Sequence, residues 1–293
     1  MKALTTLAIV LKCLPLMLLG GCSALQLVNS VSKIYPANVK TDIAFGEHPK
    51  QRFDLYLPQT SRADGRPTPV IVFFYGGSWN RGDKSEYEFV GRRLASLGYI
   101  TAIPNYRLYP DVRYPEFLKD GADSVLRIQK ELAQAAYQSL NPSSKTILMG
   151  HSAGAYNAAM LALDPRWINN AGGSHASIAG LIGLAGAYNI YPIRDVEVQP
   201  VFHHPNYPAA SQPIEFVSKS LAPTLILAPE NDTIVSIERN SVALHEALRK
   251  AGKQSRLETV VGTDHVTLIG TLSPVLFFKG SSIDPISQFV NML

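Results

Sequence analysis

Short apolar runs and amphipathic segments alternate along most of the chain. The apolar runs are rich in β-branched and aromatic residues and end at glycine, proline or polar loop residues, which is typical of buried strands. We expect strands at residues 34–45, 52–57, 69–74, 99–104, 146–149, 177–185, 224–228 and 256–261. The segments between them carry apolar residues at helical spacing, and we expect helices at residues 83–97, 116–136, 155–163, 237–251 and 284–293. This alternation predicts an α/β fold with a mostly parallel, doubly wound sheet flanked by helices.

Two regions depart from this alternation. Residues 52–57 alternate apolar and polar positions, so with residues 34–45 they are expected to form an antiparallel edge of the sheet with one covered face. Residues 187–221 are rich in proline and aromatic residues and have no clear period. We expect this stretch to be a short cap insertion over the carboxyl ends of the strands, where the active sites of such folds lie. Its aromatic side chains are expected to line a substrate pocket.

The N-terminus follows a different pattern. Lys2 precedes a largely apolar tract at residues 3–19, and small residues then lead to Cys22. This resembles a bacterial lipoprotein signal, in which the cysteine becomes the acylated first residue of the mature protein. A transmembrane anchor is the alternative, but Lys12 and Pro15 interrupt the tract, and the part after Lys12 is too short to span a bilayer.

That resemblance implies a division of the chain. Residues 1–21 would be the signal peptide, Cys22 the lipid attachment site, residues 22–33 a tether, and residues 34–293 one folded domain. It also implies an exported protein that is held by its N-terminal lipid at the bacterial cell envelope, at the outer membrane or the periplasmic face. The only other cysteine in the sequence, Cys13, would be removed with the signal peptide. The domain would then have no thiol for a disulfide, a nucleophile or a zinc site.

Composition and charge exclude several classes of protein. The 293 residues are 46% hydrophobic and 17% charged, which is an ordinary balance for a globular chain. The formal net charge of +4 is small for this length and no block of like charges stands out, which argues against a nucleic-acid-binding surface. No phosphate-binding loop or dinucleotide fingerprint is present, so we expect no cofactor.

The strand at residues 146–149 runs into Gly150-His151-Ser152-Ala153-Gly154 and then into a helix-forming tract. A serine at such a strand-turn-helix elbow is held in a strained backbone conformation with its hydroxyl exposed. Glycines two positions before and after it remove the side chains that would collide with the neighbouring strand and helix. The pattern predicts that Ser152 is a nucleophile.

A second glycine-rich turn follows the strand at residues 69–74. Gly76 and Gly77 let the backbone turn with its N–H groups unpaired, and such groups can bind the negative oxygen that develops when a carbonyl is attacked. A plain glycine turn is the alternative reading. Together with the serine elbow, the turn predicts an oxyanion hole made by the N–H groups of Gly77 or Ser78 and of Ala153.

A nucleophilic serine needs a base, and the base needs an acid that holds its tautomer. Asp232 and His265 each follow an expected strand and come after Ser152 in the order nucleophile, acid, base. Glu230 is a second candidate for the acid. Asp264 adjoins the histidine and is expected to cap a loop or to remain solvated.

The other histidines are weaker candidates for the base. His151 cannot easily fold back onto the adjacent serine, His245 falls in the middle of an expected helix, and His48 and His175 do not follow a strand. The adjacent pair at residues 203–204 could suggest a metal, but no spacing of Asp, Glu or Cys around it supports one, so we expect no metal site.

These motifs resemble an α/β-hydrolase of the alkyl ester hydrolase group, which includes bacterial carboxylesterases, isoprenylcysteine methylesterase-like proteins and kynurenine formamidase-like enzymes. The resemblance rests on residues 53–58, 75–79, 105–108, 150–154, 232–235 and 264–265, and so covers nearly the whole domain. There are two departures from the pattern. Tyr75 replaces the usual His before the glycine pair, and residues 228–232 read Ala-Pro-Glu-Asn-Asp where the group often has Gly before the Asp.

The resemblance implies a serine hydrolase that cleaves small carboxylic esters through an acyl-enzyme intermediate, with Ser152, Asp232 and His265 as its catalytic triad. An arylformamidase or another amide-type hydrolase would use the same triad and is the alternative. A third possibility is that the chain is not an enzyme but a lipoprotein that uses an inactive hydrolase fold for binding. The presence of all three triad residues argues against it, because a binding protein has no need of them.

Overall fold

One sheet runs through the computed structural model, which describes residues 24–293. Its strands are β1 Asn38–Ala44, β2 Arg52–Leu57, β3 Thr68–Phe74, β4 Ile100–Pro104, β5 Pro142–His151, β6 Ile178–Leu184, β7 Thr224–Pro229 and β8 Ser255–Val260. They lie in the order β1-β2-β4-β3-β5-β6-β7-β8. The pairs β1–β2 and β2–β4 are antiparallel, and every later pair is parallel. The predicted strands and the antiparallel edge are therefore confirmed. The single covered face expected for residues 52–57 is not observed, because five of the six residues of β2 are buried, Asp54 and Tyr56 included.

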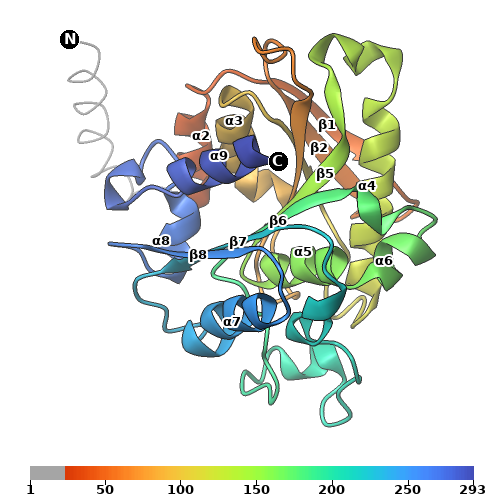
Figure 1. Ribbon diagram of the computed structural model, residues 1–293, viewed down its shortest axis with the longest axis vertical. Helices are drawn as coiled ribbons and strands as arrows, with labels where there is room; N and C mark the ends of the chain where they lie inside the picture. The colour runs from red at the N-terminus through yellow and green to blue at the C-terminus, as the bar shows by residue number, and fades with distance from the viewer. Residues whose placement is uncertain (1–23) are drawn as a thin grey trace.

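Helices cover both faces of this sheet (Figure 1). They are α2 Ala24–Ser32, α3 Glu88–Ser96, α4 Glu116–Leu132, α5 Ala153–Leu163, α6 Pro165–Asn170, α7 Ala243–Lys250, α8 His265–Gly270 and α9 Ile283–Met292. Figure 1 shows α3 and α9 on one side of the sheet and α4, α5 and α7 on the other. Short segments of tighter helix lie at Lys84–Tyr87, Ala135–Leu140, His175–Ser177, Gln199–Phe202, Pro213–Lys219 and Phe277–Lys279, and a π-helical turn lies at Glu238–Val242.

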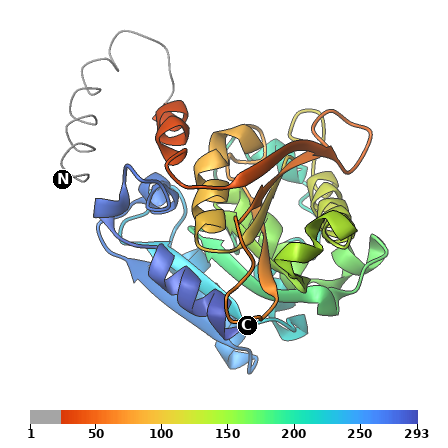
Figure 2. The ribbon, with the colours of Figure 1, turned by 90° about the horizontal axis from the view of Figure 1, so that it is seen from above.

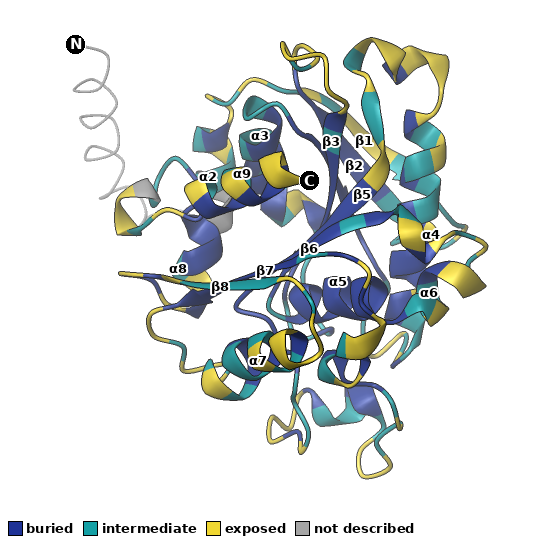
Figure 3. Cartoon of the chain, in the orientation of Figure 1, coloured by how far each residue is buried: buried dark blue, intermediate teal, exposed yellow. Residues whose placement is uncertain are grey.

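The sheet is buried because its central strands meet helices on both faces. Every residue of β4 and β7 is buried, and so are six of the seven residues of β3 and of β6. Figure 3 shows the central strands as the buried interior, while β1 at the edge of the sheet and the outer surfaces of α4 and α7 are exposed. Burial on both faces explains why these strands read as continuous apolar runs in the sequence.

Three segments differ from the expectation. Residues 24–32, expected within a tether, form α2, which packs beside α3 (Figure 2). The Asn29 side chain holds it there, because Nδ2 donates to the Ser85 carbonyl at 2.7 Å and Oδ1 accepts from the Phe89 amide at 3.0 Å. The helices α6 and α8 were not predicted, because each has only six residues and therefore shows no clear apolar period. Each begins at an aspartate N-cap, Asp164 for α6 and Asp264 for α8.

The expected signal peptide and Cys22 lie outside the described residues. Between residues 24 and 293, none of the helices has the length and apolar character needed to cross a bilayer.

Candidate active site

The elbow at the end of β5 has the strained geometry that its sequence predicts. Ser152 lies between β5 and α5 with φ 55° and ψ −122°, and its amide donates to the Leu184 carbonyl at 2.9 Å. A Cβ on Gly154 would lie 2.1 Å from the Phe74 carbonyl oxygen, and a Cβ on Gly150 would lie 2.2 Å from the Gly154 carbonyl oxygen. Both distances are far inside van der Waals contact. The two glycines are therefore required for the strand, turn and helix to pack this closely.

The structure brings Ser152, His265 and Asp232 together in one chain of hydrogen bonds. The Oγ of Ser152 lies 2.9 Å from Nε2 of His265, and Nδ1 of His265 lies 2.7 Å from Oδ2 of Asp232. The three residues lie 33 and 80 positions apart along the chain (265 − 232 and 232 − 152), at the carboxyl ends of β5, β7 and β8. Because neighbouring parallel strands end at the same edge of the sheet, the topology converges them.

The carboxylate of Asp232 has hydrogen-bond donors at both oxygens. Its Oδ1 accepts from the amides of Ile234 and Val235 at 2.9 and 2.8 Å, while Oδ2 faces His265. Burial alone would raise the pKa of Asp232, but the hydrogen bond from His265 and those of the two amides outweigh burial, and the pKa lies below its usual value. The side chain therefore stays ionised at neutral pH and holds Nδ1 of His265 as the protonated nitrogen.

The loop after β3 packs directly on the elbow. A Cβ on Gly76 would lie 3.0 Å from the Ser152 Cβ and 3.1 Å from Nδ1 of His151. Gly77, Ser78 and Trp79 have φ values of 128°, 53° and 58°, three successive residues in a conformation that L side chains rarely adopt. This backbone turns the loop beside the serine, and within the described chain the amides of Gly77 and Ser78 have no hydrogen-bond acceptor.

Two hydrogen bonds fix that loop to the rest of the fold. The indole Nε1 of Trp79 donates to Oδ1 of Asn157 on α5 at 2.9 Å. The hydroxyl of Tyr106 donates to the Tyr75 carbonyl at 2.7 Å, and the Tyr75 and Tyr106 rings stack with their centroids 4.7 Å apart. Tyr75, which departs from the expected His, is thus a buried packing residue. Its carbonyl takes part in bracing the loop, and its hydroxyl hydrogen-bonds to no residue that the structure describes.

His151 has a role in the site that the sequence reasoning missed. Its side chain does turn away from Ser152, as expected, and its Nε2 lies 2.8 Å from the carbonyl oxygen of His265. Because a carbonyl only accepts, Nε2 carries the proton. Burial, with a smaller contribution from the nearby His265, lowers the pKa of His151 to about 3, so the ring is neutral. The sequence did show a second histidine, His151, at the end of a strand. Its hydrogen-bond partner is a backbone carbonyl, however, and a backbone partner cannot be read from the sequence.

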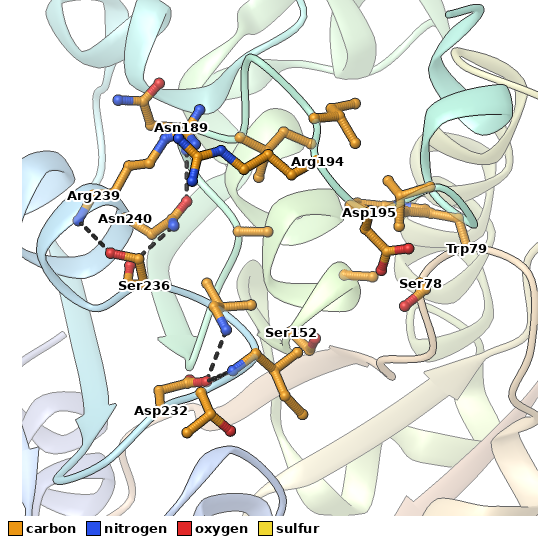
Figure 4. Close-up of a pocket in the computed structure, with 18 of the residues that line it drawn as sticks. Ser78, Trp79, Ser152, Asn189, Arg194, Asp195, Asp232, Ser236, Arg239 and Asn240 are labelled. Carbon is orange, nitrogen blue, oxygen red and sulfur yellow. Dashed lines mark hydrogen bonds between the residues drawn. The ribbon is translucent and has the colours of Figure 1, made fainter.

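A pocket of about 560 Å³ opens at this edge of the sheet (Figure 4). Ser152, Ser78 and Ala153 lie in its wall, together with Asp232 and residues between Ala187 and Val198. The predicted insertion therefore does border the site. Two amide side chains hold its backbone. Oδ1 of Asn240, from the turn before α7, accepts from the amides of residues 188 and 189, and Oε1 of Gln212, within the insertion, accepts from the amide of residue 190.

The expectation that the aromatics of residues 187–221 line the pocket is wrong. Phe202 is fully buried and packs edge-on against Trp79 and Tyr156, with ring centroids 5.0 and 5.5 Å apart. Tyr188 and Phe216 are buried as well, while Tyr191 and Tyr207 are half-buried and stack on one another with their ring centroids 4.6 Å apart. The part of the insertion that borders the pocket carries aliphatic, amide and charged side chains instead.

The other sequence candidates have structural partners. Oε2 of Glu230 accepts from the Gly262 amide at 2.9 Å and so stays on the loop before His265. Asp264 caps α8, accepting from the amides of Val266 and Thr267. Nε2 of His203 lies 2.7 Å from the Tyr114 carbonyl, and residues 24–293 contain no group of three His, Cys, Asp or Glu side chains that could hold a metal ion.

Comparison with known proteins places this geometry in a family. A family model described as BD-FAE matches residues 53–248, about two thirds of the chain. The chain belongs to the BD-FAE family. The matched region holds β2 to α7, including the elbow, the loop after β3 and Asp232, while His265 lies beyond it.

Relatives of this BD-FAE protein carry the names of ester and amide hydrolases. It is 30% identical over 194 residues to an isoprenylcysteine alpha-carbonyl methylesterase of Arabidopsis thaliana, a match that covers 65% of this chain and 43% of the relative. It is 27% identical over 237 residues to a kynurenine formamidase of Danio rerio, covering 79% of this chain and 76% of the relative. The chain thus spans less than half the length of the methylesterases that it matches.

A solved structure confirms the fold. A truncated carbohydrate esterase from gut microbiota superposes with a TM-score of 0.71 at 16% identity, over 88% of this chain and 96% of that one. At such low identity the likeness concerns architecture alone. With the strand order and the serine elbow it confirms the predicted α/β-hydrolase fold.

Proposed function

We propose that this protein is a serine hydrolase that cleaves small carboxylic esters through an acyl-enzyme intermediate. The proposal rests on one observation above all, the hydrogen-bonded chain from Ser152 through His265 to Asp232 inside a pocket. A serine hydroxyl is a weak nucleophile until a base removes its proton, and this geometry supplies that base at 2.9 Å. The family and the names of the relatives support the same class of reaction.

In the proposed mechanism, Oγ of Ser152 attacks the ester carbonyl carbon while Nε2 of His265 takes its proton. Asp232 stays ionised and stabilises the imidazolium that forms. The carbonyl oxygen becomes an oxyanion, which the N–H groups of Gly77 or Ser78 and of Ala153 stabilise. His265 then gives the proton to the leaving alcohol. Water repeats the sequence on the acyl-enzyme and releases the acid.

Labelling with a fluorophosphonate probe tests the nucleophile. The wild-type chain should be modified at Ser152, as found by peptide mapping, and should hydrolyse aryl acetates. Ser152→Ala should lose labelling and lose on the order of 10⁶ in rate, because no other group replaces the nucleophile. Ser61→Ala, at an exposed loop position, is the matched control and should keep the activity of the parent. Modification of another serine, or activity retained in Ser152→Ala, contradicts the proposal.

Amide-type hydrolysis is the second candidate, and a specific observation favours it. The kynurenine formamidase relative matches over 76% of its own length, a larger share than the methylesterases. A triad of this kind also cleaves formamides. Comparing kcat/KM for N-formylkynurenine, aryl acetates and peptides separates the two, since a formamidase would turn over the first at least as well as the second.

We also propose that the mature protein is anchored to the cell envelope by lipid on Cys22. The support is the sequence alone, a short apolar tract that ends in small residues before the cysteine. Each buried methylene of an acyl chain contributes about 0.8 kcal/mol, so several chains would hold the protein at a bilayer.

A further inference from the structure

Two arginines line the candidate active-site pocket without an acidic partner. Arg194, from the insertion after β6, and Arg239, from the turn before α7, both border the same cavity as Ser152. Neither forms an ion pair with any carboxylate in the part of the chain that the structure describes. Other arginines do form ion pairs, such as Arg107 with Asp120 and Arg166 with Asp164, although Arg113 and Arg249, outside the pocket, also form none within the described chain.

The two side chains lie on one side of the pocket. Figure 4 shows Arg194 and Arg239 extending toward the same region, away from Ser78. Arg239 is half-buried, and one of its Nη2 hydrogens is used by the Tyr191 carbonyl. That bond fixes the side chain against the insertion, while its remaining N–H groups have no acceptor among residues 24–293. Arg194 is exposed and makes no hydrogen bond from its side chain to a described residue.

The acidic groups of the pocket do not neutralise this side. Asp232 is bound to His265 and to two backbone amides. Asp195 lies next to Ser78 in Figure 4, where its Oδ1 accepts from the Glu197 amide at 2.9 Å. The pocket is therefore positive on the side of the arginines and negative beside the loop after β3. An anionic group on a substrate would be attracted to the first and repelled from the second.

We infer that the pocket binds esters that carry a carboxylate, with Arg194 and Arg239 holding that carboxylate while Ser152 attacks the ester. Guanidinium groups match a carboxylate with two parallel N–H bonds, and such charge-assisted pairs are stronger in a partly enclosed site than in water. A volume of about 560 Å³ suits a small substrate of this kind. The inference rests on the proposed ester hydrolysis and names the substrate class of that same site.

Pairs of esters that differ only in charge test this inference on the full chain. The first pair is 4-acetoxybenzoate and 4-acetoxybenzamide, with the charge on the alcohol part. The second is the mono-4-nitrophenyl ester of adipic acid and its terminal amide, with the charge on the acyl part. The measured quantity is the ratio of kcat/KM for the anion to kcat/KM for the neutral amide. Because each variant is compared with itself, a general change in activity cancels.

The parent should favour the anion in at least one pair, which also tells which side of the ester faces the arginines. In that pair Arg194→Gln and Arg239→Gln should each lower the ratio about ten-fold, as expected for loss of a charge-assisted hydrogen bond. Arg239→Lys should lower it less, since it keeps the charge and loses the planar fork. Arg249→Gln, an exposed arginine of α7 outside the pocket, is the control and should leave the ratio within two-fold.

Two outcomes contradict the inference in different ways. Hydrolysis of the neutral esters, with ratios in Arg194→Gln and Arg239→Gln within two-fold of the parent for both pairs, overturns the carboxylate site and leaves the proposed esterase intact. No hydrolysis of any of the four esters by the parent overturns the proposed function and this inference with it.

Discussion

The brace under the loop after β3 gives a stability prediction with an internal control. Tyr75 and Tyr106 are both fully buried, and their rings stack on one another. They differ in what their hydroxyls do. That of Tyr106 donates to the Tyr75 carbonyl at 2.7 Å, while that of Tyr75 hydrogen-bonds to none of the described residues. The variants Tyr106→Phe and Tyr75→Phe therefore remove the same atom from the same cluster, one with a hydrogen bond and one without.

The difference between the variants measures the hydrogen bond. Tyr106→Phe leaves a buried carbonyl without the donor that satisfies it, which costs about 1–3 kcal/mol of unfolding free energy. Tyr75→Phe removes a buried hydroxyl that has no partner, so its effect should be near zero or stabilising. Since that carbonyl immediately precedes Gly76 and Gly77, we expect Tyr106→Phe to lower kcat for an aryl acetate more than it changes KM, because the loop would be less well positioned in the transition state.

Equilibrium unfolding in urea, followed by tryptophan fluorescence, gives the two free energies. Steady-state kinetics on the same preparations gives kcat and KM. Equal unfolding free energies for the two variants would show that the Tyr106 hydroxyl contributes nothing to the loop. A larger loss in Tyr75→Phe than in Tyr106→Phe would reverse the assignment of the brace.

Three further predictions follow from the site, the pocket and the N-terminus. The pKa of His151 is about 3 in the folded chain and about 6.5 in the unfolded chain, so the unfolded state binds more protons as the pH falls. The contribution of this residue should therefore lower the unfolding free energy by about 2 kcal/mol between pH 7 and pH 5. His151→Gln keeps a neutral donor and should lose that part of the slope in urea unfolding at the two pH values; an unchanged slope contradicts the pKa. In a series of 4-nitrophenyl esters, kcat/KM should be highest for short acyl chains, since extra methylenes gain binding only while a pocket of about 560 Å³ has room for them. A clear preference for acyl chains beyond about ten carbons would contradict this prediction. Metabolic labelling with an alkyne palmitate analogue should mark the wild-type chain and not Cys22→Ser, and an unlabelled wild type defeats the lipid anchor without affecting the hydrolase assignment.

The periodic parts of the fold could be predicted because their burial follows directly from residue type. The strand at residues 52–57 has the expected bounds, and the long helix predicted from Glu116 ends four residues earlier than expected, at Leu132. The elbow was predictable for a different reason. A Cβ at residue 154 or 150 would lie 2.1 or 2.2 Å from a carbonyl oxygen, so only glycine fits at these positions. The backbone geometry therefore requires a glycine pattern that can be recognised in the sequence.

The insertion between β6 and β7 could not be predicted at the same level. Its conformation depends on single side chain to backbone hydrogen bonds, such as that from the Ile190 amide to Oε1 of Gln212 at 2.7 Å, which have no period. Its aromatics were expected at the pocket because aromatic residues often line ligand sites. In the structure Phe202 fills space between Trp79 and Tyr156 instead, since the insertion has no strand or long helix to form a core of its own.

Chemistry and selectivity therefore depend on different parts of the chain. Ser152, His265 and the loop after β3 are fixed by the sheet and by close backbone contacts, such as the 3.0 Å that would separate a Cβ on Gly76 from that of Ser152. Side chains such as Arg194 and Ile193 come from the insertion, which contributes no strand to the sheet and is held to the scaffold by hydrogen bonds such as that of Asn240 and by the packing of Phe202. A substitution in the insertion can alter charge or shape at the pocket without moving the backbone that carries Ser152, the proposed nucleophile. We therefore expect changes of substrate class to arise between Ala187 and Val198, and changes in the elbow to remove the reaction altogether.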